Sequence, residues 1–510
     1  MNAKTIPVVL VGAGPAGLTA ATLLAQYGIE SLVLERWEGV YPQPRAVHLD
    51  GEIRRIVERL GVGDEFDAIS RPAQGLRLVD ADQRVLAQFD RDSAGGRNGH
   101  PEANLFDQPE LEEILRANLR LYPAVTLRGS AEVTAVTEES GCVRVDFNDR
   151  TTGRAESVCA EYVLGCDGAN SLVRDAIGGR MRDLRFEQRW LVVDLATTAD
   201  LGHWDGVYQV CDPARAATYM RIGRTRHRWE FRLLPGESAD DYRDLPRLRP
   251  LLTPWIVPDV FERLELVRVA EYTFRAQLAD RWRKGRVFLL GDAAHLTPPF
   301  IGQGMGAGMR DAANLTWKLA GVLRGELPEG VLDSYETERK PHARAMIRLA
   351  KLTGLTMTEG GELGNRLRGL IAPRLPQVPG LTRMVTGGES PPLHRSDLVV
   401  APLLRHLAGR LIPNSRLADG RRVDEVMAGR FAIVTADAPP AEDRALCEQR
   451  YGVVIHAQPG TDLYRWLRRG HSVAVLVRPD GAVQRCGGSL SALYAALPRF
   501  VPSVRSACAG

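Results

Sequence analysis

The sequence of 510 residues contains no stretch that approaches the roughly 20 uninterrupted apolar residues of a membrane-spanning helix. Its N-terminus runs directly into an apolar stretch, without the basic region, long apolar core and cleavage site of a secretion signal. We therefore expect a cytoplasmic protein with no membrane partner. The net charge of +3 is small, and no basic block carries interleaved aromatic residues, which argues against nucleic acid as a partner.

Paired cysteines are also lacking. The seven cysteines are scattered and odd in number, and none forms a Cys-x-x-Cys motif, so free thiols in a reducing compartment are expected. No histidine, cysteine and carboxylate residues show the spacing of metal ligands, and no metal site is predicted. What is present is the composition of a soluble globular protein, with 44% hydrophobic and 25% charged residues. The length predicts two or three domains.

A glycine-rich turn directly follows the first apolar stretch. Residues 6–11 predict a buried parallel strand, residues 18–27 a helix, and residues 31–34 a second strand. This order of strand, Gly-x-Gly-x-x-Gly turn, helix, strand and acid is the fingerprint of a dinucleotide-binding fold. The helix N-terminus offers unpaired N–H groups and the positive end of its dipole to phosphates. The predicted cofactor-binding residues here are Gly12, Ala13, Gly14, Pro15, Ala16, Gly17, Glu35 and Arg36.

The acid of this fingerprint discriminates between ligands. Glu35 lies 21 residues after Gly14, where a carboxylate can accept both hydroxyls of an adenosine ribose. The same negative charge would repel a 2′-phosphate. FAD or NAD therefore fits this turn better than NADPH does.

A second glycine run begins at Gly291 and ends at Gly308. Residues 286–290 predict the strand before it and residues 309–323 the helix after it, while two prolines, 298 and 299, stiffen the loop between them. Most of its glycines stand well after the strand, and no further strand ending in an acid follows, so a second dinucleotide-binding fold is disfavoured. We expect this loop to contact the far end of the same cofactor. A ligand long enough to reach both sites favours FAD over NAD.

Four motifs in order resemble those of the single-component flavin-dependent aromatic hydroxylases, the p-hydroxybenzoate hydroxylase class. They are the N-terminal fingerprint, the segments 44–46 (Pro-Arg-Ala) and 106–109 (Phe-Asp-Gln-Pro), the Asp-Gly motif at 166–174, and the segment 291–304. The resemblance covers residues 5–350 strongly and the rest loosely. Segments 190–194, 211–213 and 229–237 are also similar to the 3-(3-hydroxyphenyl)propionate hydroxylase subgroup.

The resemblance implies further site residues. For FAD these are Arg45, Gln108, Asp167, Gly291, Asp292, Gly302, Gln303, Gly304 and Met305, with Asp167 also implicated in binding NADPH. The candidate catalytic residues are His48, His295 and Pro298. Each histidine has a structural alternative, which is a loop residue bonded to backbone for His48 and a satisfied structural residue for His295. Gly306 departs from the family, in which a polar residue such as Asn is common at this position.

The reaction that the resemblance implies is hydroxylation of a phenolic ring, ortho or para to an existing hydroxyl. NADPH or NADH would reduce FAD, O₂ would add to the reduced flavin at C4a, and the hydroperoxide would deliver the OH group. The substrate would be a phenylpropionate-like phenol or an aromatic polyketide or antibiotic intermediate. The alternatives are an FAD-dependent reductase or dehydrogenase without oxygen insertion, and a flavin-binding protein without turnover.

Arginines recur between positions 221 and 228, and their alternation from 224 onward predicts that they share one face of a strand. The predicted substrate contacts are Tyr219, Arg221 and Arg224, with the arginines as partners of a substrate carboxylate. The alternatives are a solvated strand face for the arginines and core packing for the tyrosine.

The expected fold class is α/β, with a doubly wound, Rossmann-like FAD-binding domain, an inserted mixed β-sheet substrate domain and a C-terminal thioredoxin-like domain. The FAD-binding domain is expected to comprise residues 1–74, 106–180 and 270–355, and the substrate-binding domain residues 75–105 and 181–269. Residues 356–404 are expected to form a helical linker region. Residues 405–510 resemble the thioredoxin-like domain of phenol hydroxylase relatives, and their expected role is packing or formation of a homodimer.

Overall fold

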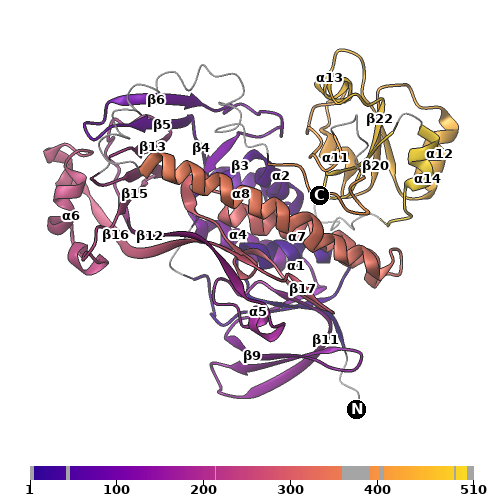
Figure 1. The fold of residues 1–510 in the computed structure, drawn as a ribbon, viewed down its shortest axis with the longest axis horizontal. Coiled ribbons are helices and arrows are strands. Elements are labelled where there is room, and N and C mark those ends of the chain that lie inside the picture. The colour runs from indigo at the N-terminus through magenta and orange to yellow at the C-terminus, as the bar shows by residue number, and fades with distance from the viewer. Residues whose placement is uncertain are drawn as a thin grey trace.

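The computed structural model describes residues 5–41, 46–212, 214–358, 390–400, 407–487 and 490–501. Within these ranges the chain forms an α/β fold with two eight-stranded sheets, a four-stranded sheet and a three-stranded sheet. Figure 1 shows the C-terminal elements, coloured yellow, as a lobe beside the two large sheets. The predicted α/β class is confirmed.

The first large sheet has the order β17-β18-β11-β1-β2-β8, and β9 and β10 extend it antiparallel to β11. Strand β1 pairs in parallel with β2 and β11, and β18 lies parallel to β11. The strands are β1 Ile6–Val11, β2 Ser31–Leu34, β8 Val125–Arg128, β9 Ala131–Glu138, β10 Val143–Asp149, β11 Ala155–Gly165, β17 Arg283–Lys284 and β18 Val287–Leu289. The parallel strands are short apolar runs, as expected for a sheet covered by helices.

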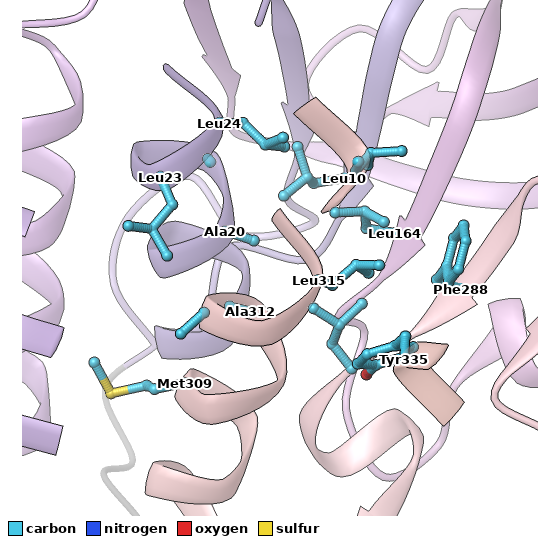
Figure 2. Packing of buried hydrophobic residues seen from close by; sticks show 14 of the residues in the cluster. Leu10, Ala20, Leu23, Leu24, Leu164, Phe288, Met309, Ala312, Leu315 and Tyr335 are labelled. Atoms are coloured by element: carbon cyan, nitrogen blue, oxygen red, sulfur yellow. The ribbon is translucent and has the colours of Figure 1, made fainter. Parts of the chain in front are cut away.

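Helix α1 (Pro15–Gln26) packs against α4 (Gln108–Leu119) and α7 (Gly304–Leu323). Figure 2 shows the resulting core, in which Leu10 of β1 and Leu164 of β11 lie near Leu315 of α7. Phe288 of β18 and Tyr335 of α8 (Ser334–Thr358) complete it, and the Tyr335 hydroxyl donates to the Leu289 carbonyl at 2.7 Å. Close packing here holds the ends of β1 and β18, where the two glycine runs begin.

The second large sheet has the order β19-β16-β12-β15-β14-β13-β5-β6. Its strands are β5 Gly75–Val79, β6 Val85–Asp90, β12 Met181–Ala196, β13 Val207–Val210, β14 Ala217–Ile222, β15 Arg226–Arg232, β16 Glu265–Ala279 and β19 His295–Leu296. One face packs on helix α6 (Leu245–Leu252) through a core that includes Tyr219, Trp229 and Leu248. Short 3-10 helices at Ala239–Tyr242 (η1) and Pro258–Arg263 (η2) flank α6.

A small three-stranded sheet is built from strands that come before β5 and after β6 in the chain. It comprises β3 (His48–Asp50), β4 (Arg71–Pro72) and β7 (Ala103–Leu105), with helices α2 (Gly51–Leu60) and α3 (Gly63–Ile69). Helix α5 (Leu172–Ala176) follows β11, and the 3-10 helices η3 (Gly291–Ala293), η4 (Pro299–Ile301) and η5 (Glu329–Asp333) connect the later elements.

The C-terminal lobe contains a sheet of order β21-β20-β22-β23. Its elements are α11 Val423–Met427, β20 Ala432–Thr435, α12 Ala441–Gln449, β21 Val453–His456, α13 Asp462–Arg469, β22 Ala474–Val477, β23 Val483–Gly487 and α14 Leu490–Ala496. Two ion pairs join it to the rest of the chain: Arg478 binds Glu338 of α8 at 2.8 Å in a buried pair, and Arg55 of α2 binds Asp424 at 2.6 Å in a partly buried one.

The predicted helix over 309–323 begins five residues earlier, at Gly304, so the last glycines of the second run are helical. The linker expected at 356–404 falls mostly outside the described residues. Among the helices of the described ranges, none combines the length and the apolar character needed to cross a membrane.

Candidate active site

One cavity of about 1350 Å³ is lined by residues from both large sheets. Its lining includes the turn after β1 and residues of the second glycine run. The part of it that is lined by strands β5, β6, β12, β13, β14, β15 and β16 of the second sheet is called the chamber. The two glycine runs therefore face the same space, as the sequence predicted.

The turn after β1 needs its glycines. Gly12 has a φ of +102°, and a Cβ there would lie 2.4 Å from the Cys166 carbonyl oxygen. A Cβ on Gly17 would lie 2.1 Å from the Gly12 carbonyl oxygen, so this position brings helix and turn together. The space beside Gly14 is open. The first turn of α1 has neither a side-chain cap nor an acidic residue, so its N–H groups are free to bind phosphates.

Glu35 lies at the mouth of this turn. Its side chain is nearly buried, and its two oxygens accept the N–H groups of Ala13 at 2.7 Å and of Trp37 at 3.1 Å. The carboxylate lines the cavity and retains lone pairs for ribose hydroxyls. Arg36 lines the cavity as well. Arg45 lies outside the described residues.

Gln108 and Asp167 also line the cavity. Gln108 accepts the Ala46 N–H at 2.7 Å and donates to Glu112 at 2.7 Å. Asp167 accepts the Ser171 hydroxyl at 2.5 Å and the Val173 N–H at 3.0 Å. Both side chains therefore brace the turns around the cofactor space through bonds to their neighbours.

The second glycine run has two tasks. Gly291 has a φ of +61°, and a Cβ on Gly308 would lie 3.0 Å from the Gly291 Cα and 3.1 Å from the Ala16 Cβ. These two glycines let α1 and α7 approach closely. Other residues of the run, Asp292, Gly302, Gly304 and Met305, line the cavity. Helix α7 also starts without a side-chain cap or an early acid, so a second helix N-terminus faces the cofactor space.

Gln303 and Pro298 do not line the cavity, although both neighbours of each do. The Gln303 amide instead donates to Asp50 at 2.7 Å and accepts from Arg310 at 2.7 Å, in a buried network. A direct cofactor contact through the Gln303 side chain is therefore not what the structure shows. The side chain ties the start of α7 to β3.

The two candidate histidines are placed differently. His48 lines the cavity, with Nε2 3.1 Å from Arg91 and Nδ1 3.5 Å from the Gly302 carbonyl oxygen. Burial and then the Arg91 charge lower the pKa of His48 to about 4, so this histidine is neutral at neutral pH. His295 is buried away from the cavity and donates from Nε2 to Asp311 at 2.7 Å. The buried Nδ1 of His295 has no hydrogen-bond partner among the described residues, so the satisfied structural alternative holds for Nε2 alone, and the residue does not line the cavity.

The predicted substrate contacts on β14 point away from the cavity. Thr218 and Met220 line the cavity, whereas Tyr219 and Arg221 alternate to the opposite face. The Tyr219 hydroxyl is 2.9 Å from His227 within the core under α6, and Arg221 donates to the carbonyl oxygen of Arg224. Arg224 is exposed in the turn after β14 rather than on the strand. The sequence carried no sign of which face is buried against α6.

Sequence reasoning predicted a substrate-binding sheet but did not identify the residues that line the chamber. Its apolar wall comes from alternate residues of distant strands, namely Leu76, Leu78, Phe89, Trp190, Val192, Met220, Tyr272 and Phe274. Its chargeable groups include Arg91 after β6 and Glu230 of β15. Period-two alternation marks such positions within one strand, but the strands that face one cavity are set by sheet order.

The spacing of residues in the sequence also did not predict one group of three side chains of the kinds that bind metals. Glu139 and Cys142 lie in the turn between β9 and β10, and their ligand atoms lie within 4.8 Å of each other and of Cys159 on β11. Arg144 already pairs with Glu139 at 2.9 Å. None of the three residues lines the cavity.

Comparison with known proteins agrees with this geometry. Residues 5–350 match the FAD binding domain family. Over 94% of its length the chain is 34% identical to a probable NADH-specific resorcinol 4-hydroxylase of Rhodococcus jostii, 92% of which is covered. It is 32% identical, over 99% of its length and 98% of the relative, to a 3-(3-hydroxy-phenyl)propionate/3-hydroxycinnamic acid hydroxylase of Burkholderia cenocepacia.

A solved structure covers nearly the whole fold. The crystal structure of a ternary complex of aklavinone-11 hydroxylase with FAD and aklavinone has a TM-score of 0.78 and 25% identity, and the match covers 96% of this chain and 98% of that one. The chain therefore belongs to the FAD binding domain family, and its cofactor is FAD. It is an FAD-dependent aromatic hydroxylase, as the four motifs predicted.

Proposed function

We propose that this protein hydroxylates a phenolic ring, with NADH as the reductant and O₂ as the source of the inserted oxygen. The observation that carries the proposal is the single cavity that joins the dinucleotide turn to the apolar chamber. When bound, FAD supplies the reductive activation of O₂. The residues of the chain bind this cofactor, orient the substrate ring and exclude water.

Particular residues would hold the cofactor. The N–H groups at the start of α1 would bind the pyrophosphate, and Glu35 would bind the adenosine ribose. Asp292 and the backbone at Gly304 and Met305 would lie against the other end of FAD. We assign His48 a positioning role, because it links Arg91 to the Gly302 turn while staying neutral.

Aromatic packing would keep the chamber dry. Phe300, in the 3-10 helix before α7, packs edge-on against two aromatic rings. Its ring centroid lies 6.0 Å from that of Trp190 and 5.8 Å from that of Phe186. A Cβ on Gly354 of α8 would lie 2.3 Å from the Phe300 ring, so a glycine is needed for this contact. These contacts hold the loop of the second glycine run against β12 of the second sheet. We propose that this packing excludes water from the chamber.

We assign substrate binding to the second sheet, which takes strands from 75–105 and 181–269, and structural packing to a thioredoxin-like C-terminal domain. The C-terminal sheet supports this, with β20 and β21 parallel and β22 and β23 antiparallel. The homodimer and the cytoplasmic location stay predictions.

The substrate is proposed to be a small phenol of the kinds in the names of the two relatives, a resorcinol or a hydroxyphenylpropionate. The experiment supplies NADH, O₂ and each phenol to FAD-loaded protein. Oxygen uptake that depends on the phenol, with a product heavier by one oxygen atom, is expected. NADH oxidation that yields only peroxide with every phenol would contradict the proposal.

A further inference from the structure

We propose that Glu230 accepts the proton of the substrate's phenolic hydroxyl. This inference rests on the proposed function and names the group that activates the ring. Glu230 lies on β15 and lines the chamber. It stands in none of the flavin motifs.

Register places Glu230 in the middle of the chamber wall. It pairs with Val192 of β12 on one side and with Thr218 of β14 on the other. Thr218 in turn pairs with Gln209 of β13. All four residues line the cavity. Glu230 is therefore the acid of a row that crosses four strands and faces the chamber.

The polar neighbours of Glu230 are already satisfied without it. The Thr218 hydroxyl donates to the Gln209 side-chain oxygen at 3.0 Å, and the Gln209 amide donates to the Ala217 carbonyl oxygen at 3.0 Å. None of the described residues donates a hydrogen bond to the Glu230 carboxylate. A hydrogen-bond acceptor enclosed in this way is left for a donor on a ligand.

No other carboxylate of the cavity is in this position. The remaining six each have a polar partner; they are Glu35, Glu112, Glu132, Asp167, Glu271 and Asp292. Glu271, the other acid of the chamber, pairs with Arg189 at 2.7 Å. Among the described acids that line the cavity, Glu230 is the one whose carboxylate has no hydrogen-bond or ion-pair partner in the protein.

The charges around Glu230 suit a proton acceptor. Arg228 on the same strand binds Asp194 of β12 at 2.7 and 2.9 Å, and Arg268 of β16 shares that carboxylate at 2.9 Å. On the other side, Thr218 and Gln209 are uncharged. Burial raises the pKa of Glu230, which Arg228 and Arg268 lower and Asp194 raises. A raised pKa makes the carboxylate a better match for a phenolic proton.

His48 and Arg91 are among the other chargeable groups that line the cavity. Both ring nitrogens of His48 already have neighbours, and its low pKa makes it a weak base. Arg91 carries no basic lone pair. Neither competes with Glu230 for the proton.

The step balances as a proton transfer. The phenolic O–H bond breaks, the proton forms a new O–H bond on Glu230, and the electron pair stays on the phenolic oxygen. The resulting phenolate is richer in electrons at its ortho and para carbons, where oxygen insertion is proposed. The proton returns to solvent or product after turnover.

The test uses FAD-loaded wild-type protein, Glu230→Gln and Glu230→Asp. Glu265→Gln, an exposed acid on β16, is the matched control. Dissociation constants are measured for resorcinol and for its dimethyl ether by changes in flavin absorbance. Loss of a charged acceptor is expected to weaken resorcinol binding about 10- to 100-fold and to leave the ether unchanged. Turnover should lose its acid limb in Glu230→Gln and keep it in Glu230→Asp.

The outcomes separate the two proposals. Hydroxylation by the wild type with unchanged binding and pH profile in Glu230→Gln would overturn the role of Glu230 and leave the function standing. Binding of phenols that depends on Glu230, without oxygen insertion, would overturn the function and support Glu230 as the phenol acceptor. A wild-type protein that binds neither resorcinol nor 3-(3-hydroxyphenyl)propionate would overturn both.

Discussion

Asp311 and Gly291 are joined by a buried hydrogen bond, in which an Asp311 oxygen accepts the Gly291 N–H at 3.0 Å. The same oxygen accepts from His295 at 2.7 Å, and the other accepts from Arg339 at 2.9 Å. Arg339 also donates to the Ala307 carbonyl oxygen at 3.2 Å. One carboxylate of α7 thus holds both ends of the loop at the flavin.

Replacing Asp311 with Asn should therefore lower the unfolding free energy of the part of the protein that is built around the first large sheet. Arg339 would remain buried without its anionic partner, which costs about 3–5 kcal/mol of unfolding free energy. Urea unfolding followed by flavin fluorescence measures the effect. Asp240→Asn, at an exposed ion pair, is the control and should change little. Equal midpoints for the two variants would contradict the role given to Asp311.

Gly17→Ala should prevent normal FAD binding. The added Cβ would meet the Gly12 carbonyl oxygen at 2.1 Å, so the turn and α1 must move apart. We expect purified protein with less than about half of the wild-type flavin and a stability lower by roughly 1–3 kcal/mol. Gly39→Ala has open space around it and serves as the control. Full flavin content in Gly17→Ala would refute the turn geometry.

Glu35→Gln should weaken FAD binding about 10- to 100-fold, because an amide is a poorer acceptor than a carboxylate for the ribose and for the Ala13 N–H. Fluorescence titration of flavin-free protein with FAD gives the dissociation constant. The exposed Glu65→Gln is the control. An unchanged constant would show that the adenosine end lies elsewhere.

Docking of the C-terminal lobe should depend on pH through Glu338. Burial raises its pKa, but the Arg478 and Lys318 charges outweigh this and lower the pKa to about 2 from the usual 4.5 of a glutamate. A depressed folded-state pKa gives stability that is present above 4.5 and lost as the pH falls towards 2. The loss should be on the order of 3 kcal/mol.

Unfolding midpoints in urea between pH 6 and pH 3 test this expectation. Glu338→Gln should be less stable at pH 6 and should show a flatter dependence on pH. Glu329→Gln, an exposed residue, should follow the wild-type curve. Parallel curves for Glu338→Gln and wild type would exclude Glu338 as the source.

Arg91→Gln distinguishes acidic from neutral substrates. Arg91 lines the cavity and its Nε has no hydrogen-bond partner, so the guanidinium can bind a substrate carboxylate. The KM for 3-(3-hydroxyphenyl)propionate should rise about 10- to 100-fold, and the KM for resorcinol should change much less. A similar change for both phenols would place Arg91 at the cofactor rather than at the acid.

Local pattern was sufficient to predict the dinucleotide turn, because strand, glycines, helix and acid are consecutive there. Gly17 lies against the Gly12 carbonyl oxygen, as the close packing predicted for it requires, and Glu35 lies beside the same turn, where it accepts the Ala13 N–H. The same reasoning began α7 too late, since three glycines at the start of a helix resemble a loop in sequence.

The faces of the second sheet could not be predicted in this way. Tyr219 and Met220 are adjacent in sequence, yet one packs under α6 and the other lines the chamber. The choice depends on α6, which is added after β15 in the chain. His295 was likewise predicted beside the flavin, whereas in the structure it donates a hydrogen bond to Asp311, sixteen residues later in the chain.

The order of residues along the chain thus specified the turns that hold FAD, since consecutive residues build those turns, and the resemblance of its motifs to a known family implied the reaction class. Only the folded structure joined Leu78, Trp190 and Glu230 into one chamber. These residues come from strands far apart in sequence, and their meeting depends on the pairing of β5 with β13 and of β12 with β15. Sheet order is set by packing of the whole domain, so no single segment encodes it.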